Sequence, residues 1–283
     1  MFADGVELLA VLLAAGWVGL VLNAIVDRRT WMLGQSPRAT LLLTVGTAVL
    51  MFAVQARLAD RIHDAGGSAT RLDSAVWIYI LGHRDSALTE LAEVLNTAGG
   101  WLSLAVLSLA ATGVLVLRRH WVEAAIVLAA PALTVVVGPG SKLGYHRPRP
   151  PVFGHLVRVT DSSLPSGHTL DATIVLGVLA VVVASRRRER WRRVVVGVTA
   201  ATGIVAVGTS RVYLGVHWAT DVLAGWALGC AWVAVGAAAL SMLRASNLQG
   251  PQVRDHNLQT DDRRDSYLTS SRASNRSRAR FRA

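Results

Sequence analysis

Long apolar segments dominate the chain and alternate with shorter polar ones. Seven of the apolar segments approach or exceed the roughly 20 residues that a helix needs to cross a bilayer. They cover residues 3–25, 39–58, 99–117, 121–139, 168–185, 193–209 and 218–243. This pattern predicts an all-α, multi-span transmembrane bundle, with a core of six helices and one extra helix at the N-terminus.

The longest interruption between these segments covers residues 59–98. It contains two short, partly apolar segments, 73–82 and 86–97, which are too short to span a bilayer. They are predicted to be helices lying on the membrane surface, with a partly ordered loop as the alternative. The first apolar segment begins with Asp4 and Glu7 and without Lys or Arg, so it is interpreted as a retained helix rather than a signal peptide.

Composition agrees with a membrane protein, because 52% of the 283 residues are hydrophobic and the mean hydropathy is +0.42. The net charge of +11 lies in short basic runs between apolar segments and in the C-terminal tail, which argues against nucleic-acid binding. The only cysteine, Cys230, excludes an intramolecular disulfide. We predict three regions: an N-terminal helix with a cytoplasmic loop (1–38), a membrane domain (39–243) and a disordered basic cytoplasmic tail (244–283).

The distribution of basic residues also predicts the orientation of the protein in the cell membrane. With seven spans, the short loops on one side are much richer in Lys and Arg, so this side is predicted to be cytoplasmic. These loops are residues 26–38, 118–120 and 186–192. The polar motifs described next all fall on the opposite, extracytoplasmic side.

Three polar motifs lie at the ends of apolar segments. The first contains Lys142, Arg149 and Pro150, the second is Pro165-Ser166-Gly167-His168, and the third contains Ser210, Arg211, His217 and Asp221. A Ser-Gly turn at the start of a helix exposes free backbone N–H groups, which form an anion site together with the helix dipole. Lys142, Arg149 and Arg211 add three cations, so the motifs predict a phosphate-binding site.

The third motif also contains a candidate nucleophile. His217 and Asp221 lie one turn apart on the same helix face, where the carboxylate can hold the Nδ1–H group and leave Nε2 free to attack phosphorus. An aspartate that only stabilises a helix N-terminus is the alternative. Because the sequence has no carboxylate cluster and no HExxH spacing, neither a metal nor another cofactor is predicted.

Taken together, the motifs resemble the type 2 phosphatidic acid phosphatase (lipid phosphate phosphatase) superfamily. Its pattern is K-x6-R-P, P-S-G-H and S-R-x5-H-x3-D, and every fixed position matches within a region of about residues 39–243. The resemblance implies that His217 forms a phosphohistidine, that His168 protonates the leaving oxygen and then activates water, and that no metal is needed. The implied phosphate-binding residues are Lys142, Arg149, Ser166, Gly167 and Arg211.

Three charged residues near the motifs, Arg147, Arg158 and Asp171, lie outside this pattern. Arg147 is predicted to lie behind the phosphate-binding residues or at their rim. The loop from Arg147 to Arg158 is predicted to hold a second phosphate. Contact with lipid headgroups alone is the alternative for these two arginines. Asp171, one turn after His168, is expected either to pair with His168 or a site arginine or to face water.

The expected function is therefore that of an integral membrane lipid phosphatase. The second-phosphate argument favours a polyprenyl diphosphate such as undecaprenyl diphosphate, with phosphatidic acid and phosphatidylglycerol phosphate as alternatives. A lipid phosphotransferase on the same site also remains open, whereas the vanadium haloperoxidases that share these motifs are soluble. A non-catalytic relative is disfavoured because no motif residue is missing. The oligomeric state is not predicted: Gly225 and Gly229 indicate either close packing within the bundle or a dimer face.

Overall fold

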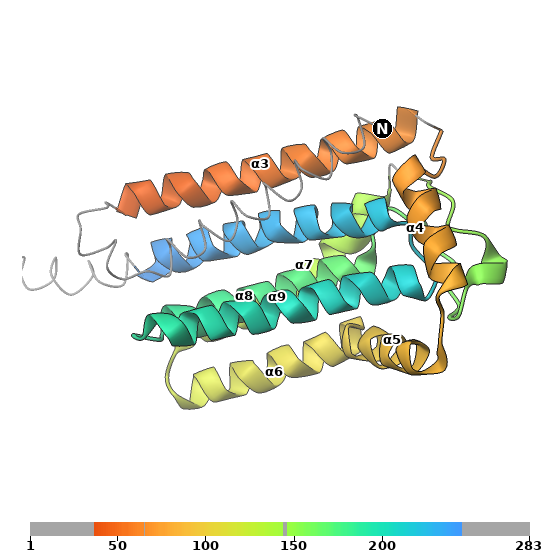
Figure 1. Ribbon diagram of the computed structural model, residues 1–283. Coiled ribbons are helices and arrows are strands. Elements are labelled where there is room, and N and C mark those ends of the chain that lie inside the picture. The colour runs from red at the N-terminus through yellow and green to blue at the C-terminus, as the bar shows by residue number, and fades with distance from the viewer. Residues whose placement is uncertain (1–36, 65, 144–145, 245–283) are drawn as a thin grey trace, which may run out of the picture. The chain divides into compact units, whose positions relative to one another are not determined.

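A computed structural model describes residues 37–64, 66–143 and 146–244 of the chain. All its regular elements are helical in these residues, which confirms the predicted all-α fold. In the order of Figure 1, they are α3 (Pro37–Asp64), α4 (Arg71–Gly82), α5 (Ser86–Ala98), α6 (Trp101–Leu117), α7 (Trp121–Lys142), the 3-10 helix η1 (Val152–Gly154), α8 (Gly167–Ser185), α9 (Arg190–Tyr213) and a last helix, Ala219–Arg244, called here the 219–244 helix.

Five of these helices are long and apolar enough to cross a membrane: α7, α8, α9, the 219–244 helix and the Leu41–Asp64 part of α3. A sixth span arises if α5 and α6 are counted as one, since they are joined by a 56° bend. The described residues thus agree with the six-helix core expected from the sequence. The predicted first helix, 3–25, and nearly all of the predicted tail, 244–283, lie outside the described residues.

The two short segments between α3 and α6 are helices, and each begins at a side-chain cap. The hydroxyl of Thr70 accepts a hydrogen bond from the backbone N–H of Asp73, and the Asp73 carboxylate accepts one from the N–H of Thr70, which forms a capping box for α4. Asp85 caps α5 by accepting a hydrogen bond from the N–H of Leu88. Helix α4 crosses one end of the bundle in Figure 1.

Two helices form the centre of the bundle. In the apolar 18-residue stretches of α8 and of the 219–244 helix, 61% is buried inside the protein. The corresponding shares are 22% in α9 and 33% in α7. Gly225 and Gly229 allow these two helices to approach closely, because a Cβ atom at Gly229 would lie 2.5 Å from the Cβ atom of Thr173 in α8. The two glycines therefore pack within the bundle rather than forming an exposed dimer face.

Other helices surround this pair and keep apolar side chains on their outer surfaces. Helix α3 packs against the 219–244 helix, where the rings of Phe52 and Trp232 meet edge to face. Helices α6, α7 and α9 contact one another or α8. Large apolar side chains such as Leu102 and Leu109 of α6 remain exposed, as expected of a surface that faces lipid.

Helices α3, α7 and α9 extend beyond their predicted apolar segments, and the extensions of α7 and α9 concern the motifs. Pro139 does not end α7, which continues to Lys142. Helix α9 continues to Tyr213, so Ser210 and Arg211 lie in its last turn rather than in a loop. Both extensions carry a motif residue to the same end of the bundle, where α8 and the 219–244 helix begin.

Candidate active site

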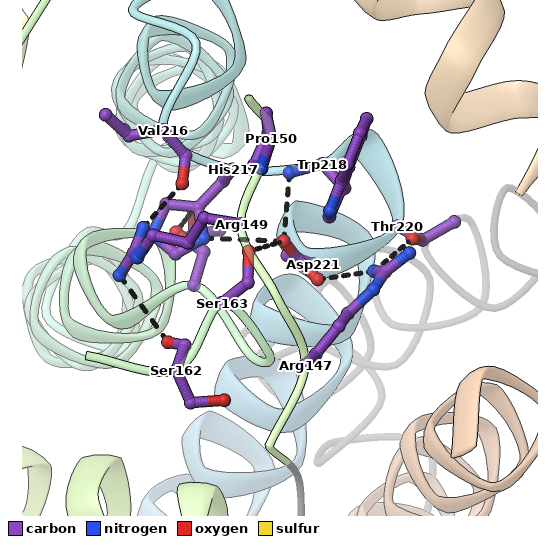
Figure 2. Close-up of polar contacts among 12 residues, drawn as sticks. Arg147, Arg149, Pro150, Ser162, Ser163, Val216, His217, Trp218, Thr220 and Asp221 are labelled. Carbon is purple, nitrogen blue, oxygen red and sulfur yellow. Dashed lines mark hydrogen bonds and ion pairs between the residues drawn. The ribbon is translucent and has the colours of Figure 1, made fainter. Parts of the chain in front are cut away.

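The three sequence motifs meet at one end of the bundle because consecutive spans run in opposite directions. Lys142 lies in the last turn of α7, and Gly167 begins α8. Arg211 lies in the last turn of α9, and His217 precedes the 219–244 helix by two residues. The proline-rich loop between α7 and α8 brings Arg149 to the same place, where it contacts His217 (Figure 2).

His217 lies at the centre of this cluster and is 2% exposed. Its Nε2 atom is 3.1 Å from the Nη1 atom of Arg149, and its Nδ1 atom is 3.5 Å from the Oδ2 atom of Asp221. A guanidinium group can only donate, so Nε2 carries the lone pair and Nδ1 carries the proton that faces Asp221. The separation of 3.5 Å is long for a hydrogen bond, and Nδ1 of His217 has no other partner among the residues that the structure describes.

Burial lowers the pKa of His217 to about 4, and this effect outweighs the opposite influence of Asp221. The imidazole is therefore neutral near pH 7, which is the protonation state that a nucleophile needs.

Asp221 is held on several sides and is fully buried. Its Oδ2 atom accepts hydrogen bonds from the hydroxyl of Ser163 at 2.5 Å and from the backbone N–H of Trp218 at 2.9 Å. Its Oδ1 atom accepts from Nη1 of Arg147 at 2.5 Å. These contacts, shown in Figure 2, fix the carboxylate beside the imidazole.

Among the three predicted phosphate-binding cations, Arg149 makes the most hydrogen bonds to the protein. Besides His217, it donates to the carbonyl oxygen of Val216 at 2.5 Å and to the Oδ1 atom of Asp161 at 2.6 Å. Its Nε atom also donates to the backbone carbonyl of Asp161 at 2.8 Å. The forked guanidinium thus joins the loop between α7 and α8 to the segment that carries His217.

Asp161 joins Arg149 to a second cation, because its Oδ2 atom also accepts a hydrogen bond from Nζ of Lys142. Burial by itself raises the pKa of Asp161, but the hydrogen bonds and charges of Lys142 and Arg149 outweigh it and lower this pKa to about 2. Two of the three predicted phosphate-binding cations, Lys142 and Arg149, are therefore already paired with an ionised carboxylate, that of Asp161.

The third cation, Arg211, is 2% exposed and donates a hydrogen bond to the side-chain oxygen of Asn96 in α5. Its Nε atom is buried and, within the described residues, has no hydrogen-bond partner. His168 lies close enough to Arg211, His217, Lys142 and Asp161 to interact with them electrostatically. An anion that binds here could therefore contact a donor that the protein itself leaves unused.

The start of α8 contributes a backbone site. No heavy atom lies within 4 Å of the position that a Cβ atom would take at Gly167, so the backbone beside it borders open space. Ser166, which precedes it, is fully buried, and its hydroxyl accepts a hydrogen bond from Thr169 at 2.9 Å. The N–H of Ser166 is already bound to the carbonyl of Asp221, which leaves its hydroxyl proton as the donor for a ligand.

Two predictions for residues outside the motifs need correction. Arg147 lies behind the phosphate-binding residues, which is one of its two predicted places, but it is 3% exposed and binds Asp221 and Asp73, so its guanidinium is not placed to hold a second phosphate. Asp171 contacts the hydroxyl of Thr134 in α7 rather than His168 or a site arginine. In both cases the charged group binds a partner that is far away in the sequence, and no local spacing indicates this partner.

The structure also brings into the site residues that the sequence interpretation missed. They are Asp73, Asn96, Asp161, Ser163 and Thr220. Asp161 and Ser163 lie near the second motif and Thr220 lies within the third, but their residue types gave no signal of their own. Within residues 37–64, 66–143 and 146–244, no group of three or more His, Cys, Asp or Glu side chains is arranged to hold a metal ion.

Comparison with known proteins gives the same family as the motifs. The sequence model of the PAP2 superfamily matches residues 123–244. The chain is 40% identical over 84 residues to phosphatidylglycerophosphatase B of Bacillus subtilis, which covers 28% of this chain and 39% of that protein. It is 36% identical over 106 residues to an undecaprenyl-diphosphatase of Sulfolobus acidocaldarius, which covers 36% of this chain and 47% of the relative.

A shorter match of 76 residues, 40% identical, links the chain to glucose-6-phosphatase 3 of Mus musculus and covers 25% of this chain and 22% of that protein. The chain thus matches less than half the length of each of these three relatives. The fold is similar to the solved structure of the transmembrane PAP2-type phosphatidylglycerolphosphate phosphatase of Bacillus subtilis, with a TM-score of 0.58 and 29% sequence identity. The similarity covers 67% of this chain and 93% of that one. Residues 123–244, which contain all three motifs, thus match the PAP2 superfamily, and the apolar helices and the transmembrane neighbour support a multi-pass membrane protein.

Proposed function

We propose that the chain is an integral membrane lipid phosphatase that removes a terminal phosphate from a lipid phosphate or diphosphate through a phosphohistidine. The observation that carries the proposal is the environment of His217, with Arg149 at 3.1 Å from Nε2 and Asp221 at 3.5 Å from Nδ1. A neutral imidazole between a phosphate-binding cation and an orienting carboxylate is arranged for attack on phosphorus.

The reaction would proceed in two steps. In the first, Nε2 of His217 forms a bond to phosphorus, the bond from phosphorus to the lipid oxygen breaks, and protonated His168 gives its proton to that oxygen. In the second, neutral His168 takes a proton from water as the water oxygen attacks the phosphohistidine. Inorganic phosphate leaves, and His217 is restored as a neutral imidazole.

Charge stabilisation would come from three cations and a helix start. Lys142, Arg149 and Arg211 would hold the phosphate oxygens on which negative charge accumulates in the transition state. The hydroxyl of Ser166 and the free N–H groups at Gly167 would add neutral donors. No step in this scheme requires a metal ion, because these donors already supply the positive charge.

The substrate would present its phosphate at the level of the lipid headgroups, with its tail in the bilayer. The site lies at the ends of apolar helices, and the loop charges favour the extracytoplasmic side. The burial of Arg147 removes it from the argument for a second phosphate, although Arg158 is still exposed. Phosphatidylglycerol phosphate and undecaprenyl diphosphate are therefore equal candidates, in line with the names of two relatives.

The test is a phosphate-release assay with the purified chain in detergent. The panel contains phosphatidylglycerol phosphate, undecaprenyl diphosphate, phosphatidic acid and the water-soluble glucose 6-phosphate, each with and without EDTA. We expect at least one of the three lipids to turn over faster than glucose 6-phosphate, without inhibition by EDTA and without activity in His217→Ala. If the wild type released phosphate no faster than His217→Ala from every lipid of the panel, the proposal would be overturned.

A further inference from the structure

A buried arginine lies between two buried carboxylates behind His217. Arg147 is 3% exposed, Asp73 is 1% exposed and Asp221 is fully buried. The Nη1 atom of Arg147 lies 2.5 Å from Oδ1 of Asp221, and its Nη2 atom lies 2.7 Å from Oδ2 of Asp73. A single forked side chain thus joins a carboxylate of the active site to one on α4, a helix outside the three motifs.

The carboxylate of Asp73 accepts hydrogen bonds from the N-terminal ends of two helices. Its carboxylate accepts a hydrogen bond from the N–H of Thr70 in the capping box of α4. It also accepts from the N–H of Thr220 at 2.9 Å, in the first turn of the 219–244 helix, and from the Thr220 hydroxyl at 2.9 Å. A carboxylate is favourable at the positive end of each helix, so Asp73 fixes α4 against the helix that carries Asp221.

Arg147 is held on further sides, which leaves its guanidinium little freedom to turn. Its Nε atom donates to the carbonyl of Gly67 at 3.4 Å, and its Nη2 atom donates to the carbonyl of Ser68 at 3.3 Å. The Nη1 atom also donates to the hydroxyl of Thr220 at 2.8 Å. The plane of the guanidinium, and with it the direction of its bond to Asp221, is set by these partners.

The two oxygen atoms of Asp221 have different neighbours, and this difference links Arg147 and Asp73 to the proposed attack by His217. Oδ1 is bound by Arg147, whereas Oδ2 faces Nδ1 of His217. Ser163 and the N–H of Trp218 hold Oδ2, and Arg147 is the charged group that holds Oδ1, so the rotation of the carboxylate relative to the imidazole depends on Arg147 as well as on these two donors. A displacement of about 1 Å at such a place can cost about 100-fold in rate.

We propose that Asp73 and Arg147 are positioning residues for the nucleophile: Asp73 holds Arg147, Arg147 orients Asp221, and Asp221 orients His217. This inference rests on the proposed function. It assigns to α4 a role in the reaction, although α4 contributes no residue to the phosphate-binding cations. Removal of either positioning residue should slow the chemical step and leave lipid binding nearly unchanged, because neither contacts the phosphate.

The variants are chosen to separate positioning from stability. Asp73→Asn keeps the shape of the side chain but removes its charge, and Arg147→Lys keeps the charge but loses the fork. The matched control is Glu123→Gln, which weakens the ion pair of the buried Glu123 with the exposed Arg186 (2.9 Å) at the opposite end of α7. All three should lower Tm, since each disturbs an ionic contact of a buried side chain.

Steady-state kinetics on the lipid that the wild type turns over fastest then give the decisive comparison. For Asp73→Asn and Arg147→Lys we expect kcat per folded protein to fall by about 10- to 100-fold, with KM changed by less than about threefold. Glu123→Gln should keep the wild-type kcat. In an Asp221→Asn background, Asp73→Asn should have less than about twofold further effect, because it acts through Asp221.

Each other outcome contradicts a specific part of the account. If Asp73→Asn and Arg147→Lys lower Tm as the control does but keep kcat, the network only caps helices and the positioning role is wrong. A rise in KM at constant kcat would show that Arg147 acts in binding and also overturns the role. If the wild type itself releases no phosphate from any lipid, the proposed function fails, and the positioning role fails with it.

Discussion

The Nη1 atom of Arg149 lies 3.1 Å from the Nε2 atom of His217, on the side where the imidazole lone pair points (Figure 2). The proposed reaction needs this lone pair for phosphorus and the same guanidinium for a phosphate oxygen. An incoming phosphate must therefore enter between the two groups, so that Arg149 exchanges the imidazole for an oxygen of the substrate. The contact between Arg149 and His217 thus aligns the imidazole until, in the proposed reaction, a phosphate oxygen replaces it.

Asp161 provides a direct test of this exchange. Its carboxylate binds both Lys142 and Arg149, although its side chain is 58% exposed. A phosphate has to compete with it for these cations. In Asp161→Asn we expect the inhibition constants of inorganic phosphate and orthovanadate to fall by several-fold, a modest change because an exposed ion pair contributes only about 1 kcal/mol.

The control for this measurement is Asp60→Asn, which removes an exposed carboxylate from α3 and should leave both inhibition constants unchanged. Unchanged or weaker inhibition of Asp161→Asn would contradict the idea that Asp161 competes with phosphate.

The low pKa of His217 predicts how the stability of the fold depends on pH. Burial places this pKa at about 4, below the ordinary value of 6.5. The folded protein therefore favours the neutral imidazole, and this contribution to stability is complete above about pH 6.5 and is lost as the pH falls toward 4. Asp161, with a pKa of about 2, stays ionised in the folded protein in this window, and most of its own contribution to stability is lost only below about pH 4.

We expect the Tm of the wild type to fall between pH 6.5 and pH 4 more steeply than that of His217→Gln, measured in the same detergent and buffer series. Other titrating groups affect both proteins alike, so the difference between the two curves reports His217. Parallel curves would mean that His217 is not held neutral by burial.

Membrane orientation can be tested by labelling introduced cysteines in intact cells. Ser163 is unsuitable as a reporter because it is fully buried and donates to Asp221, whereas Thr160 on the same loop is exposed. In a Cys230→Ala background, Thr160→Cys should react with a membrane-impermeant thiol reagent. Arg188→Cys, on the basic turn between α8 and α9, should react only after the cells are opened. The reverse pattern would place the site on the cytoplasmic side.

Much of the fold could be predicted from the sequence because bilayer-length apolar segments have few alternatives to helices. The residues that meet at the site were also predictable, since Lys142, Arg211 and His217 lie at the ends of spans that alternate in direction. The ends of α7 and α9 were less predictable. Pro139 and the polar residues after Val207 indicated earlier ends, whereas tertiary contacts extend both helices.

The partners of the motif residues could not be predicted, because they depend on contacts between distant parts of the chain. Arg147 was placed near a phosphate from its position beside Arg149, yet its guanidinium points into the protein toward Asp73, 74 residues away in the sequence. Asn96 binds Arg211 across 115 residues. No periodicity or local motif in α4 or α5 marks these two side chains.

The most direct test of the account is to trap the phosphorylated enzyme. The purified chain is mixed for a short time with its fastest lipid substrate, labelled in the terminal phosphate, and is quenched under alkaline conditions that preserve phosphohistidine. The modified residue is then identified by peptide mass spectrometry. We predict a label on His217 in the wild type and none in His217→Ala. Phosphate release without any labelled histidine, or a label that persists in His217→Ala, would contradict the proposed mechanism.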